Sequence, residues 1–458
     1  MLSKDTPGAL VNLIVFANQA NFLFFFASML GVTMARPVVV YEYLLIVALV
    51  SCHRPGWVIF GSFLALFVLD LMNQISRLYL FTFVELGQSI RYLHLYEPSA
   101  DQFFLVVGFL AYLVLTYFWA SYLSLHCTVS KKSYNIIILC FCIFVCLDVA
   151  NGTSVFATRK VHIADENLGG SLFKDIGESI HWGLLTETSP TPLLEPPITT
   201  RLLTNDSIGN QLLVLVESWG LPIDPQNADT IQGFLSRHSQ SRGWETKMGS
   251  TPFEGSTVHA ELRELLGVKG DYRFFIDPKQ AGQIRSIFTK KKKQGYSTIA
   301  VHSFSGRMFQ RQVWWENIGV DSVYFFENLV KEASSRINRE TPFVSIFDED
   351  AFMFISTRAT QQKRFGYLLT VNSHLPFHDS RQPKLSSALQ TQLSTEALNQ
   401  LDRILETILF IVDNGQKNDW STILIIGDHM PPFTIAGDRK FYSQDRVPYL
   451  LLKVKSSK

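Results

Sequence analysis

The chain has 458 residues, which is longer than one compact domain usually is. Its 41 basic and 40 acidic residues give a formal net charge of +1, so the charge balance gives no reason to expect nucleic acid as a partner. All five cysteines lie in or beside the first 150 residues, which excludes disulfides and thiolate metal sites from the rest.

Long apolar runs alternate with short polar breaks over the first third of the chain. A membrane span needs about 20 apolar residues, or somewhat fewer when it is anchored at the interface. Spans are expected at 9–33, 38–53, 56–74, 102–125 and 134–151. The apolar segment 78–86 is too short to cross and is expected to lie at the membrane interface. Residues 1–151 are therefore expected to form a transmembrane domain of about five helices.

The charges beside these spans favour one orientation by a small margin. Lys4, Arg54 and the pair Lys131 and Lys132 would be cytoplasmic if the N-terminus lies inside, as the positive-inside rule prefers. An odd number of spans then places the second half of the chain outside the cytoplasm.

The second half begins after a connector. Residues 152–204 include a stretch rich in Pro and Thr, 186–200, which is typical of an extended linker. Beyond it, in 205–458, apolar strands alternate with segments of helical character, at 230–240, 258–267, 323–337 and 393–415. This alternation predicts an α/β domain in which helices sandwich a mostly parallel sheet.

Four of the expected strands end in polar residues. The strands end at Glu217, at His302, at His374 and at the pair Asp428 and His429. Their β-branched apolar runs are typical of parallel strands that are covered on both faces. Ligands of such sheets bind beyond the carboxyl ends of the strands, so we expect one shared site there.

Three of these residues have the chemistry of metal ligands. Asp428 and His429 follow an apolar strand and precede two prolines, and carboxylate oxygen and imidazole nitrogen are ordinary ligands of Zn²⁺ and Mn²⁺. Glu217 adds a second carboxylate, which would be costly to bury without a partner. We therefore expect one divalent metal ion, which could be Mn, Zn or Mg.

A nucleophile is expected close to this metal site. Ser250, Thr251, Ser256 and Thr257 precede an amphipathic helix, where a hydroxyl caps the helix or lies beside a bound phosphate. A metal-coordinated hydroxyl loses its proton more easily and becomes a nucleophile. The residue types alone leave all four candidates open.

Four segments resemble one enzyme family. GSTVHAEL, IAVHSFSGRMFQR, LTVNSHLPF and IIGDHMPPF are similar to parts of lipoteichoic acid synthase and related phosphoglycerol transferases, in the sulfatase-like branch of the alkaline phosphatase superfamily. The resemblance implies Glu217, Thr257, Asp428 and His429 as metal ligands, Thr257, His374 and His302 as catalytic residues, and Arg311, His302 and His374 as substrate-binding residues. Phe309 stands where the synthase has Trp, and Ser373 separates Asn372 from His374, so the transferred head group stays open.

The resemblance also implies a function and a location. It implies a transferase of the bacterial inner (cell) membrane with an extracytoplasmic, periplasmic catalytic domain. A membrane phospholipid would give phosphoglycerol to an extracytoplasmic glycan through a covalent threonine intermediate. Alternatives are a phosphoethanolamine transferase, a phosphodiesterase or hydrolase of the same superfamily, and a glycan-binding pseudoenzyme. A sulfatase is disfavoured, because Glu254 stands where the Cys/Ser-x-Pro-x-Arg segment of sulfatases requires Arg.

Overall fold

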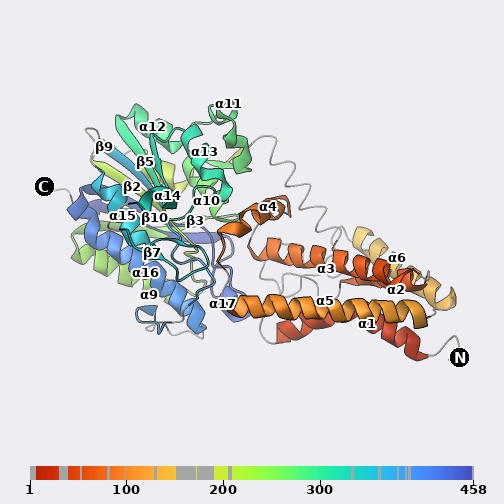
Figure 1. Ribbon diagram of the computed structural model, residues 1–458. Coiled ribbons are helices and arrows are strands. Elements are labelled where there is room, and N and C mark those ends of the chain that lie inside the picture. Colours follow the sequence, from red (N-terminus) through yellow and green to blue (C-terminus); the bar gives the residue numbers. More distant parts are fainter. Residues whose placement is uncertain are drawn as a thin grey trace. The chain divides into compact units, whose positions relative to one another are not determined.

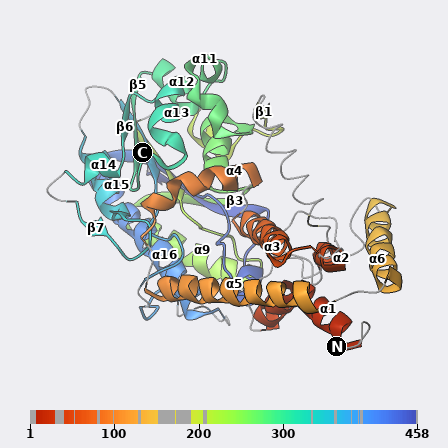
Figure 2. The ribbon, with the colours of Figure 1, turned by 45° about the vertical axis from the view of Figure 1, so that its right-hand side comes forward.

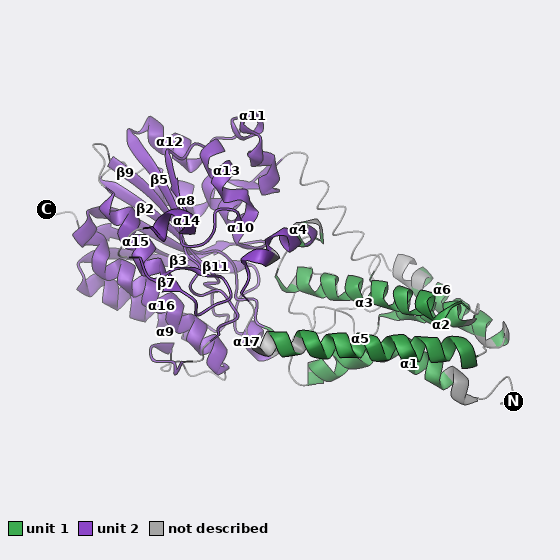
Figure 3. Cartoon of the chain, viewed as in Figure 1, with its two compact units in different colours: residues 1–86, 98–182, 434–436 green, residues 87–97, 183–433, 437–458 purple. Residues whose placement is uncertain are grey.

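The structure is a computed structural model with two compact units. It describes residues 7–29, 40–51, 54–79, 83–97, 100–127, 131–150, 172, 190–204, 209–331, 335–358, 363–378, 381–386, 389 and 393–455. Unit 1 comprises Met1–Leu86, Pro98–Trp182 and Thr434–Ala436, and unit 2 comprises Gly87–Glu97, Gly183–Phe433 and Gly437–Lys458 (Figure 3).

Unit 1 is helical. Its helices are α1 (Pro7–Met29), α2 (Leu44–Ser51), α3 (Gly56–Leu78), α5 (Ala100–His126) and α6 (Lys131–Ala150), and α4 (Phe83–Ser89) begins at its boundary with unit 2. Among the described residues, α3 and α5 are long and apolar enough to cross a membrane, over Gly56–Ser76 and Val106–His126. Shorter apolar helical segments are Val11–Ala27, Tyr41–Val50 and Tyr134–Phe144. These five segments lie at the positions of the expected spans, and the five-span topology stays a prediction.

Aromatic side chains pack the helices of unit 1 together. The ring of Phe63 on α3 lies 5.6 Å from Phe16 of α1 and 6.0 Å from Phe67, centroid to centroid. Phe67 in turn stacks on Phe109 of α5 at 5.9 Å. Aromatic pairs at these separations add to the stabilisation from burial.

Unit 2 is built on a seven-stranded sheet with the strand order β3-β11-β10-β2-β9-β5-β6 (Figure 1). The strands are β2 (Asn210–Val216), β3 (Trp244–Pro252), β5 (Tyr296–His302), β6 (Ser322–Tyr324), β9 (Lys363–Leu369), β10 (Trp420–Gly427) and β11 (Arg446–Val454). Strands β10, β2, β9, β5 and β6 pair in parallel, whereas β11 is antiparallel to both β10 and β3. The predicted α/β fold with a mostly parallel sheet is confirmed.

Helices cover both faces of this sheet, as Figures 1 and 2 show. One layer holds α9 (Pro225–Ser241), α15 (Asp348–Thr357) and α16 (Thr395–Gly415), and the other holds α8 (Ile198–Leu203), α10 (Thr257–Glu261), α12 (Ile287–Lys293) and α13 (Arg311–Asn317). Shorter elements are α11 (Pro278–Ala281), α14 (Phe326–Leu329), α17 (Ala436–Lys440) and the strand pairs β1 (Thr191–Pro192) with β4 (Val268–Lys269) and β7 (Ile337–Asn338) with β8 (Ser345–Ile346). Because both faces are covered, the central strands are apolar over most of their length.

Some expected elements differ from those observed. The expected helix at 323–337 is wrong, because Ser322–Tyr324 forms β6 and only Phe326–Leu329 is helical, while 332–334 lie outside the described residues. The expected helix at 258–267 is α10 continued by a π-helical turn, Leu262–Leu266. Of the expected connector, 152–171 and 173–189 lie outside the described residues.

Candidate active site

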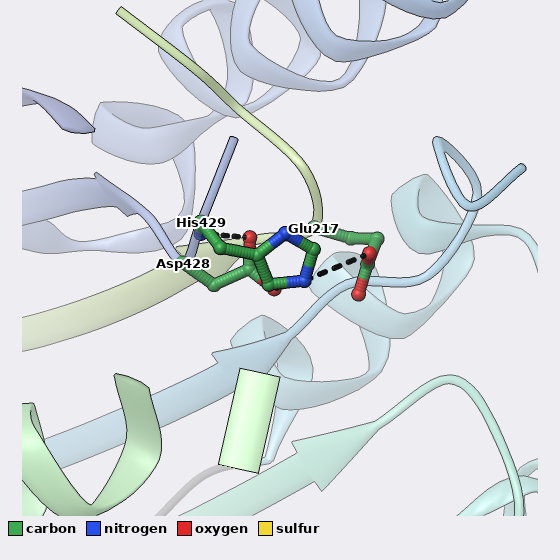
Figure 4. Close-up of side chains that lie close together, drawn as sticks. All are labelled: Glu217, Asp428 and His429. Carbon is green, nitrogen blue, oxygen red and sulfur yellow. Dashed lines mark hydrogen bonds and ion pairs between the residues drawn. The ribbon is translucent and has the colours of Figure 1, made fainter. Parts of the chain in front are cut away.

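The centre of the site lies at the ends of two neighbouring strands. Glu217 follows β2, and Asp428 and His429 follow β10, which pairs with β2 in parallel so that Gly427 lies opposite Val216. All three side chains are buried, and one ligand atom from each lies within 4.8 Å of the others (Figure 4). The register of two apolar strands thus brings together residues that are far apart in the sequence.

Ser218 holds both carboxylates in place. Its backbone N–H donates to Asp428 Oδ1 at 2.6 Å, and its hydroxyl donates to Glu217 Oε1 at 2.7 Å. To do so it adopts a φ of 57°, which is uncommon for a residue with a side chain. Such strain persists only where the surroundings impose it, and it is concentrated at functional sites.

Gly427 allows β10 to approach the segment after β2 closely, directly before Asp428 and His429. A Cβ at this position would lie 2.0 Å from the carbonyl oxygen of Trp219. Any other residue would therefore push β10 away from the segment after β2, and would move Asp428 with it.

His429 offers a free nitrogen to the cluster. Its Nδ1 lies 2.8 Å from the carbonyl oxygen of Met430, and since a carbonyl can only accept, the proton is on Nδ1. In the neutral ring Nε2 carries a lone pair, and it lies 3.3 Å from Asp428 Oδ2 and 3.6 Å from Glu217 Oε1. Within the described part of the chain, Asp428 Oδ2 is buried without a hydrogen-bond partner. A free imidazole nitrogen beside an unsatisfied carboxylate oxygen fits a divalent metal ion.

The charges of the cluster are strongly coupled. Burial, together with the charge on Glu217, raises the pKa of Asp428 to about 7. Burial also acts to raise the pKa of Glu217, but the charges on His374 and His429 outweigh it and the net pKa is lowered. Burial lowers the pKa of His429, but both carboxylates outweigh it and the net pKa is raised. Such an arrangement of perturbed groups is typical of a functional site.

Thr257 is the hydroxyl that the structure brings to the cluster. It is the first residue of α10, and its Oγ1 donates to Glu217 Oε2 at 3.1 Å and lies 3.3 Å from His429 Nε2. Ser256 caps the helix and bonds His259 instead, and Ser250 Oγ accepts from Arg446. Thr257 is therefore the candidate nucleophile that the geometry favours.

The two predicted histidines differ in exposure. His374 is half-buried, its Nδ1–H donates to the carbonyl of Leu375 at 2.6 Å, and its charge acts on Glu217. His302 is buried, and its Nδ1 lies 3.0 Å from the carbonyl of Leu369. Burial and the charge on Arg311 hold the pKa of His302 well below its usual value, so this ring is neutral.

Arg311 lies in an internal ion pair. It is 2% exposed, and its Nε and Nη2 lie 2.9 Å and 2.8 Å from Glu261 Oε2. The other oxygen of Glu261 accepts from Trp315 Nε1 at 3.0 Å and from the hydroxyl of Tyr367 at 3.4 Å. Glu261 is on α10, one turn after Thr257, so the pair fixes the helix that carries the candidate nucleophile. Glu261 was not predicted, although a carboxylate on the apolar face of that helix was a signal for a buried partner.

One comparison with known proteins finds a family match in the second half of the chain. Residues 239–456 match the sequence model of the Sulfatase family. These residues are thus similar to that family. A comparison with curated protein sequences gives no match.

Several solved structures are similar to the chain. The lipoteichoic acid synthase LtaP from Listeria monocytogenes is 18% identical, with a TM-score of 0.40 over 55% of this chain and 66% of that one. The periplasmic domain of EcEptC from Escherichia coli, in complex with Zn, is 12% identical, with a TM-score of 0.35 over 56% and 75%. The Streptococcus pyogenes phosphoglycerol transferase GacH, in complex with sn-glycerol-1-phosphate, is 13% identical, with a TM-score of 0.34 over 60% and 73%. This chain thus spans less than two thirds of the Listeria protein.

One further feature of unit 2 was not foreseen from the sequence. Asp348, at the start of α15, accepts from the backbone N–H groups of Val371 and Asn372 and from Ser303 Oγ, so it joins the segments that carry His302 and His374. The tryptophans near the site in the sequence are all buried in the core: Trp219, Trp314 and Trp315.

Proposed function

We propose that the protein is a membrane-anchored, metal-dependent transferase that moves phosphoglycerol from a membrane phospholipid to an extracytoplasmic glycan. The observation that carries the proposal is the contact of Thr257 Oγ1 with Glu217 and His429, at 3.1 and 3.3 Å, in a buried cluster at the start of a helix. Backbone N–H groups at a helix start favour a bound phosphate, so nucleophile and phosphate site would coincide.

Glu217, Thr257, Asp428 and His429 would hold one divalent cation. The unsatisfied Asp428 Oδ2 and the lone pair on His429 Nε2 fit such an ion, and three oxygen ligands with one imidazole suit Mn²⁺, Zn²⁺ or Mg²⁺. When bound, the ion lowers the pKa of a coordinated hydroxyl and offsets charge on phosphoryl oxygens.

The side chains then divide the chemistry between two half-reactions. Thr257 Oγ1 forms a bond to phosphorus, the bond from phosphorus to the diacylglycerol oxygen breaks, and the hydroxyl proton passes to Glu217 or His429, both within reach. His374, which is half-buried beside the cluster, protonates the departing diacylglycerol oxygen. A glycan hydroxyl then attacks the same phosphorus and its proton passes to His374, while the bond from phosphorus to Thr257 Oγ1 breaks and Thr257 recovers its proton from Glu217 or His429. In this proposal His302 and Arg311 line the back of the site, where Arg311 positions α10 through Glu261.

A membrane anchor suits this reaction because the donor is itself a lipid. Helices α3 and α5 meet the length and apolarity needed to cross a bilayer. We propose five spans, with the catalytic half outside the cytoplasm, as the topology. A reporter fused after Lys458 that is active only inside the cytoplasm would contradict it.

The test of the nucleophile uses the full chain reconstituted in vesicles of phosphatidylglycerol with Mn²⁺. Intact-protein mass spectrometry should show an increment of one phosphoglycerol group, which Thr257→Ala abolishes together with turnover. Thr251→Ala is the matched control, because that hydroxyl is buried in β3 and should leave the adduct unchanged. An adduct that persists in Thr257→Ala would refute the assignment of the nucleophile.

The acceptor is tested by mass spectrometry of envelope glycans with and without the protein. Loss of a phosphoglycerol substituent is expected. Loss of a phosphoethanolamine substituent instead would replace the proposed head group, and release of free glycerol phosphate without any change in a glycan would indicate a hydrolase.

A further inference from the structure

A cavity lies in unit 2 beside the candidate active site. Its volume is about 890 Å³, which is within the range of small-molecule sites. Segments of the connector from Thr191 to Ile198, helix α8, strands β3, β4 and β11 and the residues after α10 form its wall. None of the four proposed metal ligands lines it, so it is separate from the metal cluster.

The wall of this cavity carries more positive than negative charge. Two carboxylates, Glu195 and Glu254, line it. Five cationic side chains also line it: Arg201, Lys247, Arg263, Lys269 and Arg446. Lys269 pairs with Glu254 at 2.5 Å, and Arg263 pairs with Glu264 at 2.8 Å. For the other three cations, no carboxylate partner is found among the residues that the structure describes. The cavity therefore favours an anion.

Arg446 is fixed in a geometry suited to binding an anion. Its Nε donates to Ser250 Oγ at 2.9 Å, and its Nη2 donates to the backbone oxygen of Ser250 at 3.0 Å. The guanidinium is therefore held at the start of β11 without its charge being neutralised. A fixed guanidinium loses little entropy when it binds phosphate, which it matches in shape and charge.

The other part of the wall is apolar. Leu193, Leu194, Pro196, Pro197 and Ile198 come from the connector, and Phe253 is buried beneath them. Leu194 is fully exposed, at 104% of its reference area. An exposed leucine beside a basic cavity offers a contact for hydrocarbon attached to the anion.

We propose that this cavity binds the phosphate and upper acyl chains of an anionic phospholipid, at a site separate from the metal cluster. Arg446 contacts the phosphate, Lys247 and Arg201 add positive potential, and the segment from Leu193 to Ile198 contacts the hydrocarbon. Arg263 and His259 line the same cavity. Arg263 donates to the backbone oxygens of Gly427 and Asp428, and His259 bonds the cap residue of α10, so an occupied cavity adjoins the nucleophile segment.

The test measures binding without turnover. The full chain carrying Thr257→Ala, in uncharged detergent with excess chelator, is titrated with dihexanoyl phosphatidylglycerol and the Kd is measured by calorimetry. Binding should weaken about tenfold in Arg446→Gln with Lys247→Gln, since each lost charge-assisted hydrogen bond removes a sizeable part of the affinity. Lys417→Gln, an exposed lysine outside the cavity, is the matched control and should bind as the parent does. Equal binding by all three proteins would overturn the proposal.

Two further measurements distinguish lipid from free glycerol phosphate as the ligand and exclude misfolding as the cause of weaker binding. Free sn-glycerol phosphate and dihexanoyl phosphatidylcholine should both bind at least about tenfold more weakly than the anionic lipid. If glycerol phosphate binds as tightly as the lipid, the hydrocarbon contact is wrong and the site is one for soluble phosphate. Leu194→Asp changes a fully exposed side chain, so folding should be unaffected while the preference for lipid over glycerol phosphate is lost. An unchanged preference would refute the hydrocarbon contact. Because metal and nucleophile are absent, these results do not depend on the proposed transfer reaction.

Discussion

The buried pair of Arg311 and Glu261 predicts a large loss of stability in Arg311→Met. The substitution leaves the Glu261 carboxylate with only the donors of Trp315 and Tyr367, at 3.0 and 3.4 Å. Burial already raises the pKa of Glu261, and the charge of Arg311 is the main opposing influence. Breaking a buried pair by removing one partner costs about 3–5 kcal/mol, because the remaining charge is left uncompensated in the core.

This cost corresponds to a readily measured shift in Tm. For a domain of the size of unit 2, about 2–4 °C is lost for each kcal/mol, so Tm should fall by about 6–20 °C. Thermal unfolding of the full chain in detergent, followed by tryptophan fluorescence, measures the shift. The matched control is Arg336→Met. Arg336 pairs with Asp350, but its side chain is 63% exposed, so this pair should contribute only about 0–1 kcal/mol to the free energy of unfolding.

A double variant separates positioning from substrate binding. Glu261→Gln with Arg311→Met removes both charges and should recover most of the lost Tm, because the uncompensated charge is gone. If Arg311→Met keeps the Tm of the control while turnover disappears, the guanidinium acts on substrate and the reasoning from its burial is refuted.

Three further predictions follow from residues near the site. Burial raises the pKa of Asp348 from 3.8 to about 7, so the contribution of this carboxyl group to the free energy of unfolding is complete below the pKa of the unfolded chain and is lost as pH rises through about 7. Asp348→Asn should remove roughly 4 kcal/mol of this pH dependence in denaturant titrations. An unchanged pH profile would contradict the prediction. Gly427→Ala should lower Tm and metal content, because its Cβ would meet the backbone of Trp219 at 2.0 Å, whereas Gly437→Ala, with open space around its Cβ, should change neither. If a divalent metal is present at about 100 times its Kd, adding a chelator should lower Tm by an amount equivalent to about 3 kcal/mol. Glu217→Ala should abolish this difference in Tm. Equal Tm with and without chelator in the parent protein would argue against a metal site.

The sequence predicted the centre of the sheet and not its edge. Strands β2, β5, β9 and β10 each contain a continuous apolar run after polar residues at or near the start, because both faces of the sheet are covered, and this pattern is clear in the sequence. Strand β3 alternates exposed and buried residues, as in Trp244, Glu245 and Thr246, so its pattern is weak without knowledge of its partner β11. The helix predicted at 323–337 was wrong at its start, where the structure has the short strand β6. The valine and tyrosine of this strand favour β-structure.

The site residues that could be predicted from the sequence are those that stand directly after an apolar strand. Glu217, Asp428 and His429 could be placed together because parallel strands end at one edge of the sheet. The choice of Thr257 among four hydroxyls depends on which face of the turn before α10 meets Glu217, and residue types do not give that. The position of Glu261 on an apolar helix face signalled a buried partner, but not that the partner is Arg311, which lies 50 residues later in the chain.

The pairing of β2 with β10 has a consequence for how the protein is made. The contact of Ser218 with Asp428 joins residues 210 positions apart. At typical rates of synthesis, about 10–40 s pass between the emergence of β2 and of β10 from the ribosome. During that interval β2, a mostly apolar strand, has an unpaired edge on the side that β10 later occupies. The nascent unit 2 is therefore most exposed to aggregation before β10 arrives, and a chaperone that shields this edge would serve the protein at that stage.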